Sequence, residues 1–377
     1  MSVLRIEPVR TRRQQKVWLS LPWQMNAGDP CWMPPLRHSQ KLLAGFGKHP
    51  VYEYADAEQW LATRNGKPVG RIAAIHNRAH NECHRENLGF FGFFESENQP
   101  ETAAALLGAA EAWLAERGLS ACRGPVSPTI NYELGTLIDG FETPPYMLLP
   151  HNPPYYQALI EGCGYGKSQD LYAYRADTSH LGDMKRDTKM ESLDNMVRER
   201  FGVTVRPMNR SRFKEEVAMF LDIYNLALTK TWGYVPMSPA EVQAMASDLK
   251  ELIVPELARI AEVEGKPVGV VFGLLDFNPR IKAIDGRLFP FGFIRLLWNK
   301  RAINRIRIVS TNVLPEYQSW GVGVSLARSL LQPALDHGVT ACEFSWVLET
   351  NTLSRKTVEK GGAKRYKTWR VFEKSLV

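Results

Sequence analysis

The sequence predicts an α/β (α+β) protein made of two copies of one fold, each a mixed, mostly antiparallel sheet flanked by helices. The motif GKPVG at 66–70 recurs at 265–269, an offset of 199 residues, and 161–164 matches 359–362 at an offset of 198. Ala121-Cys122 matches Ala341-Cys342 at an offset of 220. Three matches in one order indicate a tandem repeat, with extra residues near 279–300 in the second copy.

The order of elements supports a mixed sheet. Each GKPVG motif lies between two apolar runs and predicts a hairpin whose turn is supplied by Gly and Pro. Strands are then expected to alternate with helices, which is typical of a mixed α/β sheet. The domain boundaries follow as 1–182 and 195–377. In the second copy we expect strands at 203–207, 305–314, 341–348 and 366–373, and helices at 213–230, 239–252, 324–337 and 352–360.

Bulk properties narrow the class of protein. A chain of 377 residues is long enough for two domains, and no apolar run is long enough to span a bilayer. The start of the chain shows no secretory signal, so we expect a cytoplasmic protein. Five scattered cysteines, never spaced as Cys-x-x-Cys, predict reduced thiols rather than disulfides or a zinc module. The net charge of +7 favours anionic ligands in general.

Two local clusters contain residue types that can bind a metal ion or nucleic acid. His76, His80, Cys83 and His84 are residue types that bind zinc, but no second ligand cluster accompanies them, so we expect a polar loop and no metal. The basic run at 11–16 is typical of a solvated helix face and predicts no nucleic-acid site.

The strongest chemical motif is the loop from Gln318 to Gly323, between a predicted strand and an amphipathic helix. Phosphate binding needs free backbone N–H groups at a helix amino terminus, and glycines that let the backbone approach the oxygens. The loop meets both requirements. A later Asn351-x-x-Ser354 opens the next predicted helix, as this kind of site requires.

This arrangement resembles the GNAT superfamily of N-acetyltransferases. The resemblance covers most of 203–377 and, through the repeat, extends more faintly to the first half. It implies acetyl-CoA or a longer acyl-CoA as co-substrate, with the pantetheine arm paired to a strand that splays from its neighbour. The residues implied for CoA binding are Asn312, Val313, Leu314, Gln318, Ser319, Trp320, Gly321, Val322, Gly323, Val324, Asn351 and Ser354.

Two departures from the family pattern affect the catalytic groups. Val358 stands where the family often has a Tyr that protonates the leaving thiolate, and the strand 305–314 lacks the frequent carboxylate base. A base would help, because an amine of pKa near 10 is only about one part in a thousand neutral at pH 7. Glu349 is the candidate base, or else a solvated strand-end residue. Tyr234, beside Trp232, is a candidate acid or acceptor-pocket residue, or else part of a buried aromatic loop.

The first copy lacks the loop motif. At the offset of 220, Asn98, Glu101 and Ala103 correspond to Gln318, Gly321 and Gly323, so this copy is degenerate and is not expected to bind CoA in the usual way. Its aromatic and proline-rich stretches, 90–94 and 151–156, either form an acceptor pocket or pack a degenerate core. Asn131 and His151 are candidate polar contacts there.

The function predicted is transfer of an acyl group, foremost acetyl, from acyl-CoA to a small-molecule or lipid amine by direct attack in a ternary complex. Two alternatives stay open. The basic, apolar segment 288–307 favours contact with a membrane surface and a long-chain lipid acyltransferase, unless it simply packs on its own domain. The missing Tyr and carboxylate favour a CoA-binding protein without turnover. The oligomeric state is unknown from the sequence.

Overall fold

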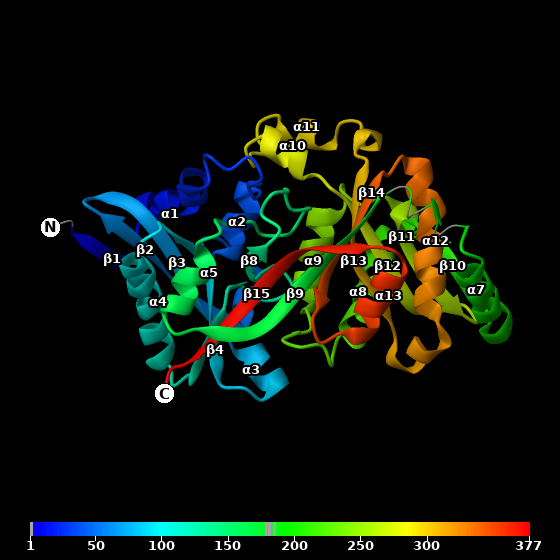
Figure 1. Ribbon diagram of the computed structural model, residues 1–377, viewed down its shortest axis with the longest axis horizontal. Helices are drawn as coiled ribbons and strands as arrows, with labels where there is room; N and C mark the ends of the chain where they lie inside the picture. Colours follow the sequence, from blue (N-terminus) through cyan, green and yellow to red (C-terminus); the bar gives the residue numbers. More distant parts are fainter. Residues whose placement is uncertain (1–2, 178, 180–181, 184–185) are drawn as a thin grey trace. The chain divides into compact units, whose positions relative to one another are not determined.

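The computed structural model describes residues 3–177, 179, 182, 183 and 186–377 (Figure 1). The chain divides into two compact units. Unit 1 takes its described residues from Met1–Leu171, Asn278–Leu296 and Lys367–Val377, and unit 2 from Tyr172–Phe277 and Leu297–Tyr366. The units therefore do not follow the chain continuously, since unit 1 includes most of the extra segment of the second copy and the end of the last strand.

Unit 1 is built on a sheet whose neighbours run in the order β1-β2-β3-β4-β5-β15-β9. The β4–β5 pair is parallel, whereas β1–β2, β2–β3, β3–β4 and β5–β15 are antiparallel. The strands are β1 (Leu4–Pro8), β2 (Ala55–Arg64), β3 (Lys67–Asn77), β4 (Leu88–Ser96), β5 (Ala121–Gly124), the end of β15 (Lys364–Ser375) and the start of β9 (Gly166–Asp177).

Helix α4 (Pro100–Ala115) supplies much of the unit 1 core, because it is rich in alanine and leucine and packs against β2, β3 and β4. Its leucines Leu106, Leu107 and Leu114 are fully buried among Trp60, Phe91 and other apolar side chains. The remaining elements are α1 (Arg12–Met25), α2 (Arg37–Leu43), η1 (Pro50–Glu53), α3 (Arg78–His84), β6 (Val126–Ser127), β7 (Glu133–Leu134), β8 (Thr136–Asp139), α5 (Tyr156–Gly162) and α10 (Asn278–Ala283).

Unit 2 repeats the pattern in the order β9-β14-β13-β12-β11-β10, with β13–β14 parallel and the β10–β11, β11–β12 and β12–β13 pairs antiparallel. Figure 1 shows α12 (orange) running beside α7 (green), in agreement with their contacts. The elements are α7 (Thr188–Phe201), β10 (Val203–Pro207), η2 (Arg210–Arg212), α8 (Phe213–Ala227), α9 (Pro239–Leu249), η3 (Pro255–Leu257), β11 (Ala258–Val263), β12 (Lys266–Leu275), η4 (Lys300–Ala302), β13 (Arg305–Val313), η5 (Pro315–Trp320), α12 (Val322–His337), β14 (Ala341–Leu348) and α13 (Thr352–Lys360); α11 (Gly292–Leu297) begins in unit 1. No helix of the described residues is both long and apolar enough to cross a membrane.

The predicted repeat is confirmed in the hairpin geometry. Asn65-Gly66 and Glu264-Gly265 both have positive φ, which defines two-residue turns of type I′. A bulge follows at Ala62/Thr63 in the β2–β3 hairpin and at Ala261/Glu262 in the β11–β12 hairpin, the same offset of 199 residues. The mixed, mostly antiparallel sheets predicted for both copies are therefore present.

The structure revises how the loops of the two copies correspond. Helix α4 and helix α12 are each 16 residues long, so Pro100 corresponds to Val322. Only residues 97–99 join β4 to α4, whereas 314–321 join β13 to α12. The equivalence of Asn98, Glu101 and Ala103 with Gln318, Gly321 and Gly323 is therefore wrong: the first copy has a shorter connection rather than a substituted loop.

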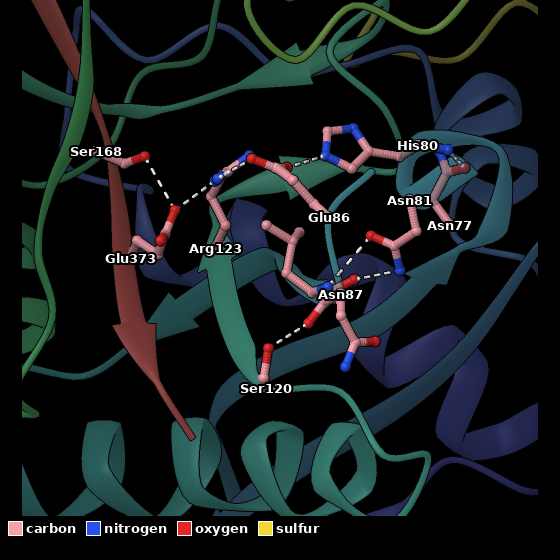
Figure 2. Close-up of polar contacts among 10 residues, drawn as sticks. Asn77, His80, Asn81, Glu86, Asn87, Ser120, Arg123, Ser168 and Glu373 are labelled. Carbon is pink, nitrogen blue, oxygen red and sulfur yellow. Dashed lines mark hydrogen bonds and ion pairs between the residues drawn. The ribbon is translucent and has the colours of Figure 1, made fainter. Parts of the chain in front are cut away.

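The histidine-rich segment of unit 1 belongs to a partly buried ionic network (Figure 2). His80 lies on α3, a short helix where a polar loop was expected, and its Nε2 is 2.8 Å from Glu86 Oε2. Arg123 donates to both oxygens of Glu86, at 2.9 and 3.0 Å, and to Glu373 at 2.6 Å. Within the described residues, no group of three or more His, Cys, Asp or Glu is placed to hold a metal ion. The network ties α3 and β5 to the end of β15.

The first prediction concerns acid stability. Burial lowers the pKa of His80 to about 4 from its ordinary value of 6.5. The unfolded chain therefore binds more protons than the folded chain between these values, and stability falls as the pH drops from about 6.5 to about 4, by up to about 3 kcal/mol. Denaturant unfolding of the wild type and His80→Gln across this range should show a shallower pH dependence in the variant. Equal slopes would contradict the assignment.

Candidate functional site

The amino terminus of α12 is open to a ligand. Gly321 occupies the N-cap with a φ of +85°, and no side chain caps the helix. A Cβ on Gly323 would meet no atom within 4 Å, whereas one on Gly321 would lie 3.0 Å from the Val197 Cγ2 methyl. The first amides of a helix have no intrahelical partner, and the helix dipole favours an anion there. The α12 terminus therefore has the geometry of a phosphate site.

The side chains of the preceding loop hold its shape. Trp320 stacks on Phe201, with ring centroids 4.6 Å apart and an interplanar angle of 21°, and Tyr317 packs edge-on against Trp320. Gln318 Nε2 donates to the Val313 carbonyl at 3.1 Å. Of the predicted loop residues, Ser319 is exposed, Val322 is fully buried and Val324 is half-buried. The side chains of Tyr317, Gln318 and Trp320 thus hold the loop in shape rather than point to a ligand.

Strands β13 and β14 separate beside this loop. Their parallel pairing begins at Arg305↔Ala341 and ends at Ile308↔Phe344. On its other edge β13 stays paired with β12 as far as Val313↔Gly269. Backbone groups of residues 309–313 that face β14 are therefore left without a strand partner, which is the splay that the resemblance implied.

Asn312 gives an independent sign that the splay takes a ligand. The residue is 5% exposed, and its Nδ2 has no hydrogen-bond partner among the described residues. A buried amide donor without a partner is rare, because it costs free energy that a ligand acceptor would recover. The pantetheine arm of CoA carries amide carbonyls that fit this need. Leu314 differs, since its N–H already donates to the Val268 carbonyl at 2.9 Å.

A buried polar cluster lies where the two strands part. Arg307 and Glu343 are register partners, 3% and 0% exposed at their side chains, with Arg307 Nε 4.0 Å from Glu343 Oε1. Ser345 Oγ donates to Glu343 at 2.6 Å and accepts from Arg307 Nε at 2.8 Å. The half-buried Tyr366 donates its hydroxyl hydrogen to the other Glu343 oxygen. The cluster is a satisfied network that can hold or move a proton.

The electrostatics of the pair follow from burial. Burial raises the pKa of Glu343, and the Arg307 guanidinium opposes that rise. Burial also lowers the pKa of Arg307 to about 10, against the effect of Glu343. Each charge is therefore retained only because the other is present.

The predicted catalytic residues lie elsewhere in unit 2. Tyr234 is 1% exposed, donates its hydroxyl hydrogen to Asn225 Oδ1 and packs edge-on against Tyr224. Glu349 is half-buried and follows the end of β14, and its carbonyl accepts from Arg355 at 2.8 Å. Trp232 is half-buried in the same loop as Tyr234. Their proposed roles remain predictions.

Asn351 and Ser354 form the N-cap of α13. Asn351 Oδ1 accepts from the Ser354 N–H at 3.0 Å. The Asn-x-x-Ser pattern is therefore a helix start, with one side-chain oxygen already used. Val358, at the position of the missing Tyr, packs among Tyr172, Tyr174 and Val347.

The sequence reasoning missed Glu343 and Tyr366, and it placed Arg307 in the basic segment 288–307, whereas Arg307 lies within β13 with a side chain that is 3% exposed. A signal was present in β14, because Glu343 interrupts a mostly apolar run, and a charge inside a buried strand needs a partner. What the sequence lacked was the register that makes Arg307 and Glu343 neighbours.

The comparisons with known proteins agree with this geometry. No family model matches the chain. It resembles a tandem GNAT protein from the clavulanic acid biosynthesis pathway, with a TM-score of 0.58 at 12% identity over 100% of this chain and 99% of that one. A GCN5-related N-acetyltransferase from Sphaerobacter thermophilus gives a TM-score of 0.53 at 11% identity, covering 99% and 96%. The fold is that of the tandem GNAT proteins.

Two curated relatives match nearly the whole chain. Protein YghO of Escherichia coli (strain K12) is 36% identical over 369 residues, which is 96% of this chain and 93% of that protein. The bacterial ceramide synthase of Caulobacter vibrioides is 34% identical over 381 residues, covering 99% and 98%. The chain belongs to the family that contains these two proteins. Its fold and this relative together support an acyltransferase.

The second prediction separates the two loop glycines. Gly323→Ala meets no atom and should keep or raise stability, by roughly 0.5 to 1 kcal/mol. Gly323→Glu should instead lower affinity for hexadecanoyl-CoA, because its negative charge would repel the phosphates at the helix terminus. Gly321→Ala should instead lose roughly 1 kcal/mol of stability, because its φ is positive. Thermal unfolding and calorimetric titration measure both effects. Unaltered affinity in Gly323→Glu would place the phosphates elsewhere.

Proposed function

We propose that this protein is an acyl-CoA-dependent N-acyltransferase that forms an amide between a long acyl group and the amine of a long-chain amino alcohol. The observation that carries the proposal is the match to the bacterial ceramide synthase over 99% of this chain. A ceramide is an amide of a fatty acid and a long-chain amino alcohol. The open α12 terminus and the β13–β14 splay supply a fitting donor site. Long-chain transfer replaces acetyl transfer as the leading hypothesis.

In this proposal the chain positions the donor by backbone groups. The first amides of α12 hold the pyrophosphate, and the strand edge at 309–313, with Asn312 Nδ2, orients the pantetheine amides. The thioester supplies the acyl group and departs as a thiolate after the amine attacks its carbonyl. No covalent acyl-enzyme is required.

The proton lost by the attacking amine must be matched by one that reaches the thiolate. Tyr366 is half-buried and is hydrogen-bonded to Glu343 behind it. Both Glu343 oxygens accept hydrogen bonds, from Ser345 and Tyr366, so in this proposal Tyr366 itself gives its hydroxyl proton to the thiolate and regains the proton that the amine loses. The pair would thus replace the acid that is missing at Val358.

Turnover tests the proposal directly. The purified chain is incubated with hexadecanoyl-CoA and a long-chain aminodiol, and thiol release and amide mass are measured. We expect equimolar thiol and N-acyl product, with acetyl-CoA used far less well. Preferred use of acetyl-CoA would restore acetyl transfer, and no turnover with either donor would favour a CoA-binding protein without catalysis.

Tyr366→Phe should lower kcat by about 10²-fold while leaving acyl-CoA affinity unchanged, because it removes only the relay hydroxyl. Full activity in this variant would exclude Tyr366 from proton transfer.

An exposed aromatic segment favours a lipid setting. Phe289 and Phe291 are 81% and 70% exposed, and Phe293 and Ile294 are 44% and 46% exposed. Arg287 and Arg295 lie in the same stretch, and Trp298, directly after α11, is 74% exposed. Large exposed apolar side chains beside basic ones are typical of a surface that meets anionic lipids. We therefore propose that this segment contacts a membrane surface.

Cosedimentation with anionic phospholipid vesicles tests that contact. Phe289→Ser combined with Phe291→Ser should reduce vesicle binding, since the exposed aromatic area is lost. Leu353→Ser is a matched control, because Leu353 is also exposed, at 76%, but lies on α13. Equal losses in both variants, or in neither, would count against a specific membrane contact.

A further inference from the structure

Unit 1 contains a pocket at the place where its own parallel strands part. The β4–β5 pairing ends at Phe90↔Arg123. Beyond it, Val126 and Ser127 fill the gap: a Cβ on Gly92 would lie 2.3 Å from the Val126 carbonyl oxygen, and Ser127 Oγ accepts from the Phe93 N–H at 2.9 Å. The backbone edge that is open in unit 2 is closed here. What remains is a cavity of about 50 Å³.

The charges in this pocket are specific to unit 1. Arg71 faces Glu95 across β3–β4 as Val270 faces Asn312 across β12–β13. The Arg71 side chain is 3% exposed, with Nη2 3.6 Å from Glu95 Oε1 and Nη1 donating to the Trp18 carbonyl at 3.1 Å. Tyr156 donates its hydroxyl hydrogen to Glu95 Oε2 at 2.7 Å. Arg71 and Glu95 therefore balance each other.

Glu133 provides the second carboxyl group of the pocket. Glu133 lines the same pocket, and within the described residues its side chain has neither an ion pair nor a hydrogen bond. Burial raises the pKa of Glu133 to about 7, and the Arg71 guanidinium opposes that rise, so this carboxyl group is only partly ionised near neutral pH. A cation beside the exposed Glu133 would favour its ionised form.

His151 adds an acceptor that does not depend on the acidic groups. Its side chain is 1% exposed, and its Nε2 lies 2.8 Å from Asp29 Oδ2. Because an ionised carboxylate only accepts, Nε2 carries the hydrogen and Nδ1 presents a lone pair. Nδ1 has no partner among the described residues, although the side chain is buried and lines the pocket. Burial also lowers the pKa of His151, which keeps the ring neutral near pH 7.

The pocket groups without a hydrogen-bond partner therefore indicate the chemical class of the ligand. The Glu133 carboxylate and His151 Nδ1 are both acceptors, and the apolar walls include Phe94 and Leu134. A carboxylate or phosphate would meet the acidic groups Glu95 and Glu133, and no lysine is among the described residues that line the pocket. We propose that the unit 1 pocket is a second ligand site, which binds the protonated amine head group of an alkylamine or amino alcohol beside Glu133 and His151, with the alkyl chain outside the cavity of about 50 Å³. The amine chemistry follows from the pocket alone, and its identification with the acyl acceptor rests on the proposed function.

Calorimetric titration of the full chain tests the site with three probes of one chain length: octylamine, octanol and octanoate. Octylamine should bind saturably, and octanol and octanoate should not. Glu133→Gln should weaken octylamine binding by about tenfold, because the charge partner is lost. The fold should tolerate this change, since the residue is exposed overall. Glu142→Gln, which alters another exposed carboxylate of unit 1, should bind as the wild type does.

His151→Phe is the second variant and should also weaken octylamine binding, provided that its thermal unfolding matches the wild type; otherwise Glu133→Gln decides. Equal octylamine and octanoate binding, or wild-type affinity in Glu133→Gln, would overturn the proposal. Thiol release from hexadecanoyl-CoA is measured on the same samples. If octylamine binds but no thiol is released, the amine site stands and the proposed function is rejected. If thiol is released but Glu133→Gln binds octylamine as the wild type does, the proposed function stands and the amine site is rejected.

Discussion

The buried pairing of Arg307 with Glu343 is the interaction on which the proposed donor site depends. Both side chains are almost completely removed from water, and their register fixes where β13 and β14 lie together. The pairing of β13 with β14 ends one residue pair later, at Ile308↔Phe344, so the ionic pair lies beside the point where the strands separate. Loss of either partner would leave an uncompensated buried charge, which typically costs about 3 to 5 kcal/mol. The Arg307–Glu343 pair therefore accounts both for the place where β13 and β14 part and for the charges buried there.

The two copies show how one fold reaches different chemistries. In unit 2 the strand edge beyond the apex is open, and the connection 314–321 ends in an uncapped helix terminus. In unit 1 the corresponding edge is filled by Val126 and Ser127, and the connection shrinks to 97–99. Anion-binding amides are thus absent from that described connection, and an acidic, acceptor-rich pocket takes their place. Divergence after duplication explains both features without a change of sheet topology.

Local patterns in the sequence were enough for the repeat and for most unit 2 elements. The GKPVG hairpins, the helix after Gly321 and the strand at 341–348 depend on turn residues and apolar periodicity, which act over short distances. The Glu343–Tyr366 contact could not be predicted, because it joins two strands whose register is set by long-range packing. The membership of 278–296 in unit 1 could not be predicted for the same reason. Asn351 shows the converse case, since a motif interpreted as a CoA contact also caps a helix.

Hydrogen exchange with and without hexadecanoyl-CoA is the most direct test of the central claim that unit 2 holds the donor by its backbone. The account predicts slower exchange at 309–313 on β13 and at 321–324 at the start of α12, with no change at 97–99 in unit 1. Amides that gain a hydrogen-bond partner exchange more slowly, so both segments should respond together. Protection confined to other segments, or no protection at ligand saturation, would contradict the account.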